Sequence, residues 1–182
     1  MTQIQNIAVD IHTHIVPADF PAYAGQHATE FGGKQWPQMA AAHDCHHKSV
    51  MIDGKNFRTV TDECWDVERR KEAMARMNIA RQVLSPMPEL LSYWLPLEDA
   101  VPLTRHVNDT IANMVAQAPD LFVGLGSVPM QDPDAATREL EKLMRDGFKG
   151  VELGSNINGA PLGDPKFDGF FAAAEELGAA IF

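Results

Sequence analysis

Five short apolar segments, most of them rich in β-branched residues, have the length and composition of buried β-strands. They span Ile7–Ile11, Gln82–Ser85, Leu121–Val128, Gly150–Leu153 and Ala179–Phe182. Apolar residues follow one another in these segments with little polar alternation. This pattern is typical of strands that are covered on both faces, as in a parallel sheet.

Helical patterns lie between these segments. An amphipathic pattern covers Asp62–Asn78, and a second helix is expected to begin near Pro102, because proline is tolerated in the first turn of a helix. The apolar residues of this second helix recur at helical spacing, at Leu103, Val107, Ile111, Met114 and Val115.

Two further helices are marked by their ends. Each is expected to begin at an Asp-Pro pair, Asp132-Pro133 or Asp164-Pro165, and to end at a glycine, Gly147 or Gly178. An aspartate cap, a proline in the first turn and a terminal glycine are the residues that helix ends prefer.

Strand and helix alternate with a regular period. The last three strands begin near residues 121, 150 and 179, so one strand–helix unit takes about 29 residues. Repeated units of this kind predict an α/β protein with a parallel sheet covered by helices, either a doubly wound open sheet or a (β/α)8 barrel. The period alone does not decide between them.

The stretch from Val16 to about Thr61 interrupts this rhythm. It is rich in proline and glycine and has little helical pattern, so we interpret it as a long insertion after the first strand. Long loops at the carboxyl ends of parallel strands often carry active-site residues. We find no domain boundary or linker elsewhere and expect a single domain over residues 1–182.

The charge balance narrows the choice of partners. The 182 residues contain 25 acidic and 15 basic side chains, a net charge of −10. A general nucleic-acid or membrane-surface binder needs a basic face, so neither partner is expected. A cationic pocket for a small acidic substrate is still compatible with this balance.

The cysteines and the N-terminus favour a cytoplasmic protein. Cys45 and Cys64 are too few to form a disulfide framework. The first ten residues lack the basic and apolar regions of a signal peptide, and no apolar run approaches the ~20 residues of a membrane span.

The sharpest chemical signal is the sequence Asp10-Ile11-His12-Thr13-His14 at the end of the first strand. Alternate residues of a strand face the same side, so His12 and His14 can converge on one metal ion. The alternative is that both histidines are satisfied by hydrogen bonds at the strand end. Their position before the long insertion favours metal binding, because active sites of parallel α/β proteins lie at this end of the strands.

Other candidate residues give weaker signals. Arg58, in the insertion, has the planar fork that suits a carboxylate, although a solvated surface arginine is the commoner case. Tyr93 and Trp94 follow the second strand and either line a pocket or pack at its rim. The histidine-rich stretch His43–His47 is interpreted as polar loop residues, because adjacent residues of a loop are poor chelators.

The motif from Asp10 to Pro17 resembles the first-strand metal motif of the amidohydrolase superfamily. Within it, the chain is similar to the family of 2-amino-3-carboxymuconate-6-semialdehyde decarboxylases. The resemblance covers nearly the whole chain. The other stretches that carry it are Asp53–Arg58, Cys64-Trp65-Asp66, Ser92-Tyr93-Trp94, and Phe122–Gly126 running on to Pro129-Met130-Gln131.

The resemblance implies a (β/α)8 barrel, of which this chain supplies the N-terminal part, about five strand–helix units. It implies a divalent ion held by His12 and His14, and Arg58 as an anchor for a substrate carboxylate. Trp94, which follows the second strand, is the second substrate-binding residue that we expect. Zinc is preferred because imidazole suits it, while cobalt, iron and manganese stay open. Relatives are often homodimers.

Two departures from the family pattern matter. The chain has Asn156 where relatives carry a histidine, which leaves the exact substrate open. It also stops at Phe182, before the third metal histidine, the catalytic histidine and the metal-binding aspartate of the family. No catalytic acid or base is therefore expected within residues 1–182, and we expect the natural chain to continue.

The sequence thus favours a metal-dependent decarboxylase of a small unsaturated carboxylic acid. Two alternatives stay open. One is a metal-dependent hydrolase of a lactone, amide or related bond on the same barrel. The other is an inactive, incomplete fragment, because two histidines supply fewer ligands than the three that a catalytic zinc site normally has.

Overall fold

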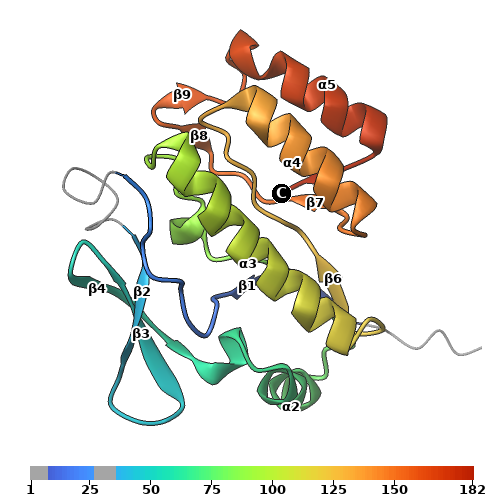
Figure 1. Ribbon diagram of the computed structural model, residues 1–182. Helices are drawn as coiled ribbons and strands as arrows, with labels where there is room; N and C mark the ends of the chain where they lie inside the picture. Colours follow the sequence, from blue (N-terminus) through green and yellow to red (C-terminus); the bar gives the residue numbers. More distant parts are fainter. Residues whose placement is uncertain (1–7, 27–35) are drawn as a thin grey trace, which may run out of the picture.

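The computed structural model describes residues 8–26 and 36–182 (Figure 1). The predicted start of the first strand at Ile7 and part of the predicted insertion lie outside these residues. Within them, no helix combines the length and the apolar character that crossing a membrane requires.

The five predicted strands are present and parallel. Strand β1 (Val9–Ile15) pairs with β5 (Arg81–Pro86), and β5 pairs with β6 (Phe122–Gly124). Strand β7 (Gly150–Val151) pairs with β10 (Ala180–Ile181), and a parallel bridge between Gly126 and Val151 joins the two groups. The spatial order is therefore β1-β5-β6-β7-β10, which follows the order along the chain, as in a barrel.

A helix separates each pair of successive strands. These helices are α2 (Val67–Met77), α3 (Leu97–Gln117), α4 (Pro133–Arg145) and α5 (Asp168–Leu177). Figure 1 shows α3, α4 and α5 in a row beside the strands. Short 3-10 turns precede α2 (Asp62–Cys64), α3 (Pro88–Leu90) and α5 (Pro165–Phe167).

The expected caps set several helix boundaries. Asp66 accepts hydrogen bonds from the backbone N–H groups of Glu68 and Arg69, and Asp132 accepts one from that of Ala135. At the other end, α5 stops at Gly178, whose φ of 63° is the left-handed conformation that glycine adopts without strain.

The start predicted for α3 is wrong. The helix begins at Leu97, so Pro102 lies inside it and not at its first turn. Proline has no N–H to donate to the carbonyl four residues earlier, which is why Pro102 resembles a helix start in the sequence. The acidic first turn, with Glu98 and Asp99, marks the actual start because it complements the helix dipole.

The predicted insertion contains a regular structure of its own. Strands β2 (Gln38–Ala41), β3 (His47–Ile52) and β4 (Lys55–Thr61) form an antiparallel sheet, which Figure 1 shows to one side of the helices. Val50 and Val60 are buried in the same apolar core as the parallel strands, so this sheet is anchored to the main fold. A small hairpin of β8 (Asn156–Ile157) and β9 (Ala160–Pro161) follows β7.

The parallel sheet curls but does not close. The rings of His12 in β1 and Phe182, directly after β10, lie 5.0 Å apart, so the two edges of the sheet approach each other on its inner side. Within the described residues, β1 and β10 each have a single neighbouring strand. Apolar side chains at these edges are exposed: Val9, Ile11, Ile181 and Phe182.

Candidate metal centre

His12 and His14 meet at the carboxyl end of β1. Their Nε2 atoms lie 3.2 Å apart and their rings are nearly perpendicular, with centroids 4.9 Å apart. Thr13, between them, points the other way and donates a hydrogen bond from its hydroxyl to the carbonyl of Val83. The side-by-side arrangement predicted for the two imidazoles is therefore present.

A bulge in β1 lies at this point. Asp10 pairs with Gln82 and Thr13 pairs with Leu84, so three steps along β1 match two steps along β5. Bulges bend a strand and redirect its side chains, and they are frequent beside active sites. The carboxylate of Asp10 accepts a hydrogen bond from the backbone N–H of His12 and so stabilises the bulged segment.

The separation of the two nitrogens fits a shared ion. A zinc ion bonds imidazole nitrogen at about 2.1 Å, so two nitrogens 3.2 Å apart subtend an angle of about 100° at the ion. This angle lies between the octahedral and tetrahedral values. The distance between the two nitrogens is therefore that of adjacent ligands on one divalent ion.

The other end of the His14 ring faces two polar groups. Its Nδ1 lies 3.2 Å from the hydroxyl of Ser85 in β5 and 3.5 Å from Oε2 of Glu152, which directly follows β7. Ser85 and Glu152 are buried, and His14 is partly exposed. Three parallel strands thus contribute to the surroundings of one imidazole.

Arg70 from α2 holds β1 in place beneath this pair. Its guanidinium donates to the carbonyl of His14 at 2.7 Å, to the hydroxyl of Thr13 and to the side-chain carbonyl of Gln82, and its Nε donates to the carbonyl of Glu63. Burial lowers the pKa of this guanidinium, because desolvation disfavours its charge.

Replacing Arg70 with Met is expected to destabilise the fold by about 3 kcal/mol. Met fills much of the volume but leaves the carbonyl of His14 and its other acceptors without a donor, and each buried unsatisfied group costs about 1–3 kcal/mol. Urea unfolding measures the change. Arg69→Met is the matched control, because Arg69 is exposed on the same helix, and a similarly small effect in both variants would contradict the role of Arg70.

Arg58 lies on β4, opposite Val50 of β3. Its guanidinium donates to Oε1 of Glu89 at 2.5 Å, and Glu89 lies just beyond the carboxyl end of β5. The ion pair places Arg58 near the edge of the parallel sheet where β1 carries its histidines, because β1 and β5 run parallel. Its side chain is 57% exposed.

Trp94 lines an open cavity of about 410 Å³ at the carboxyl side of the sheet. The other residues that line it are Tyr93, Leu95, Pro96, Leu97, Gln131, Asp132 and Asn158. The indole is 42% exposed, whereas Tyr93 is buried. Burial raises the pKa of the Tyr93 phenol to about 12, so Tyr93 stays neutral at physiological pH.

The structure does not bring Arg58 or Trp94 into contact with the histidine pair among the described residues. Arg58 contacts Glu89, and Trp94 belongs to the cavity described above. Of the four predicted site residues, His12 and His14 form a constellation, while the roles predicted for Arg58 and Trp94 stay predictions.

The histidine-rich stretch forms the turn between β2 and β3. Asp44 contacts His43 at 3.3 Å and His47 at 2.8 Å, and it also accepts a hydrogen bond from the backbone N–H of His46. The donor atoms of His43, Asp44 and His47 lie within 4.8 Å of one another, close enough to hold an ion. His46 turns away and pairs with Asp62.

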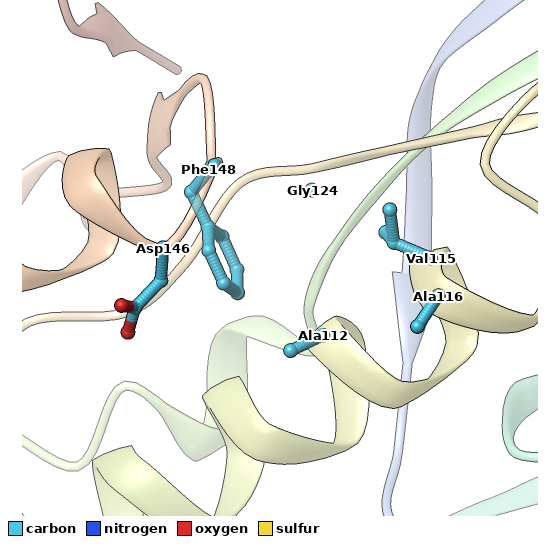
Figure 2. Close-up of a pocket in the computed structure, with 7 residues that line it drawn as sticks. Ala112, Val115, Ala116, Gly124, Asp146 and Phe148 are labelled. Atoms are coloured by element: carbon cyan, nitrogen blue, oxygen red, sulfur yellow. The ribbon is translucent and has the colours of Figure 1, made fainter.

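Another cavity, separate from the one beside Trp94, lies on the helix side of the sheet (Figure 2). It measures about 230 Å³ and lies between the C-terminal half of α3 and the connection from α4 to β7. Figure 2 shows it lined by Ala112, Val115, Ala116 and Phe148, with Asp146 at its edge. This lining offers neither an imidazole nor a cation, so we place the candidate site at the histidine pair.

Comparison with known proteins agrees with this geometry. The profile of the amidohydrolase family matches residues 9–182, which is nearly the whole chain. The chain belongs to the amidohydrolase family. The predicted resemblance to the amidohydrolase superfamily is thereby confirmed, while the metal-binding role of His12 and His14 stays a prediction.

Among curated relatives, this amidohydrolase chain is 38% identical to 2-amino-3-carboxymuconate-6-semialdehyde decarboxylase of Dictyostelium discoideum. The alignment covers 98% of the chain but 48% of the relative, so the chain spans about half the length of that protein.

Two solved structures extend the comparison. The 5-carboxyvanillate decarboxylase of Novosphingobium aromaticivorans, complexed with manganese and a nitrobenzoic acid, is 31% identical, with a TM-score of 0.62 over 66% of the chain and 35% of that protein. The IDCase of Metarhizium anisopliae in its apo form is 20% identical, with a TM-score of 0.75 over 97% of the chain and 50% of that protein. The fold is that of the first half of an amidohydrolase barrel, which confirms the predicted (β/α)8 type.

Three residues that contact His14 were not singled out from the sequence. Ser85 ends a predicted strand, and a buried serine there gives no chemical signal. Arg70 looks like any other charge on an amphipathic helix. Glu152 did carry a signal, because a carboxylate between Val151 and Leu153 in a buried apolar strand is uncommon and needs a partner.

Proposed function

We propose that this chain is the N-terminal part of a metal-dependent decarboxylase, a carbon–carbon lyase that acts on a small unsaturated carboxylic acid. The observation that carries the proposal is the pair of imidazole nitrogens, 3.2 Å apart at the carboxyl end of β1. The likeness to decarboxylases in two comparisons supports the reaction class. An acid of the aminocarboxymuconate semialdehyde type is the proposed substrate.

The ion is a divalent metal held by His12 and His14, with further ligands from outside the described residues. Imidazole ligands alone favour zinc, and zinc is the ion that the sequence predicts. The manganese in the Novosphingobium structure makes manganese an equal candidate. When bound, the ion supplies Lewis-acid polarisation of a substrate oxygen.

The residues of this chain bind and orient. Arg58 uses one side of its guanidinium for Glu89 and keeps further N–H groups for a substrate carboxylate. Trp94 offers an exposed aromatic face beside the 410 Å³ cavity for an unsaturated substrate. Loss of carbon dioxide leaves an electron pair on the adjacent carbon, and a proton then takes the place of the lost carboxylate.

Product analysis tests the reaction class. The complete protein, loaded with manganese or zinc, is incubated with carboxymuconate-type and hydroxybenzoate-type acids, and carbon dioxide is measured together with the remaining organic product. The proposal predicts one carbon dioxide per substrate consumed, and loss of this activity after chelation. Ring opening of a lactone or cleavage of an amide without carbon dioxide would identify a hydrolase instead.

Replacing Arg58 with Lys is expected to lower kcat/KM, which corresponds to an activation free energy that is higher by about 1–3 kcal/mol. Lysine keeps the positive charge but loses the two-pronged contact with a carboxylate. Steady-state kinetics of the complete protein measures the effect. Arg76→Lys is the control, because Arg76 is also exposed and paired with a glutamate, Glu63. Unchanged kinetics in Arg58→Ala would rule out the anchoring role.

A further inference from the structure

Glu152 carries a buried carboxylate that faces the imidazole of His14. It is 5% exposed, and within the described part of the chain its Oε2 atom has no hydrogen-bond partner. Burying a charged oxygen in this way is unfavourable unless a cation or a donor compensates it. The polar atom that faces it is Nδ1 of His14, at 3.5 Å. The position of this carboxylate is therefore best explained by the imidazole.

Ser85 contacts the same nitrogen of His14, and its oxygen lies 3.2 Å from Nδ1. Its hydroxyl also lies 3.1 Å from the carbonyl of Thr13, which can only accept. With the hydroxyl donating to Thr13, the Ser85 oxygen is an acceptor towards Nδ1. Both groups that face Nδ1, the Ser85 oxygen and the Glu152 carboxylate, therefore favour a proton on Nδ1 and a free lone pair on Nε2.

The two nitrogens of the His14 ring thus face different groups. Nε2 points toward Nε2 of His12, where an ion would bind, and Nδ1 points toward Glu152. The carboxylate consequently lies on the side of the ring away from the ion position. Glu152 is placed to act through His14 and not as a direct ligand.

We propose that Glu152 is a positioning residue of the metal centre, whose carboxylate accepts the Nδ1–H of His14 and holds the Nε2 lone pair on the ion. The inference rests on the proposed metal-binding role of His12 and His14 and deepens it. A carboxylate behind a metal-binding histidine fixes the ring orientation and raises its basicity, and removing such a partner weakens metal binding about 10–100-fold.

Glu152→Gln tests the inference in the complete protein. The amide has nearly the same shape but no charge, and it can present its N–H₂ to Nδ1, which favours the tautomer with the proton on Nε2. We expect the dissociation constants for Mn²⁺ and Zn²⁺, measured by calorimetry, to rise about 10–100-fold. In the metal-free protein, the ¹⁵N shifts of His14 are expected to move toward the Nε2–H form.

Glu139→Gln is the matched control. Glu139 is also a buried glutamate, but it is paired with Arg105 on the helix layer. Its variant is expected to bind both ions as the parent does. Melting of the metal-free proteins separates positioning from a structural role. Oε2 of Glu152 has no hydrogen-bond partner among the described residues, and glutamine keeps the shape of the side chain, so the melting temperature of Glu152→Gln is expected to stay close to that of the parent. A lower melting temperature with unchanged His14 shifts would contradict the inference.

The inference and the proposed function fail in different ways. If Glu152→Gln binds Mn²⁺ and Zn²⁺ within twofold of the parent while His14→Ala loses the ion, the positioning role is overturned and the metal site stands. If His14→Ala binds the ion as tightly as the parent, the proposed metal site falls and the role of Glu152 falls with it.

Discussion

Replacing His12 or His14 with Ala in the complete protein is expected to remove most of the bound metal and nearly all activity. Each variant deletes one of two adjacent ligands whose nitrogens lie 3.2 Å apart, and the deleted bond is not replaced by water with comparable strength. Metal content after dialysis, measured by atomic emission, and turnover under metal-saturating conditions give the two readouts.

The control removes two imidazoles elsewhere and so matches the double variant His12→Ala/His14→Ala. His43→Ala/His47→Ala disrupts the cluster on the β2–β3 turn, which also has donor atoms within 4.8 Å of one another. This double variant is expected to retain the ion and the activity. A His12→Ala/His14→Ala protein that still carries one equivalent of metal would show that His12 and His14 are not the metal ligands.

A polypeptide restricted to residues 1–182 is expected to self-associate and to show no turnover. Its parallel sheet has two open edges, β1 and β10, and exposes Ile11 at 61% and Phe182 at 40%. At about 25 cal/mol per Å², leaving roughly 400 Å² of apolar surface uncovered forgoes about 10 kcal/mol, which is comparable to the whole stability of a domain. We also expect no turnover because, within residues 8–26 and 36–182, the imidazoles brought together at the end of β1 are those of His12 and His14, fewer than the three protein ligands of a typical catalytic zinc site.

Light scattering and a metal-dependent carbon dioxide assay on this polypeptide check the prediction. The complete protein, purified in the same way, is the reference for both. A monodisperse monomer of residues 1–182 with multiple turnovers would show that the open sheet is tolerated and that the missing groups are not needed.

The parallel strands and their helices could be predicted because the relevant signals are local. An apolar segment such as Gly150–Leu153, or an Asp-Pro start with a glycine stop, specifies its structure within a few residues. The histidine pair could be predicted for the same reason, because residues two apart in a strand face one side. No local signal distinguishes a barrel from an open sheet, so the barrel was predicted from the family resemblance.

The antiparallel sheet in the insertion was not predicted, although one signal was present. Asp53 and Gly54 have φ values of 54° and 69° and connect β3 to β4, and an Asp-Gly pair between strands is a strong hairpin signal. The strands on either side are short and polar, so they lack the apolar alternation by which a strand is recognised in a sequence. The sequence marks Glu152 as an unusual buried carboxylate, but it does not show that Glu152 and Ser85 lie beside His14, because these contacts span 138 and 71 positions of the chain.

Anomalous diffraction from crystals of the complete protein, collected above and below the absorption edge of the bound ion, locates the ion. We expect one strong anomalous peak within about 2.3 Å of Nε2 of both His12 and His14. A peak on His43, Asp44 and His47 instead, with none between His12 and His14, would contradict this expectation.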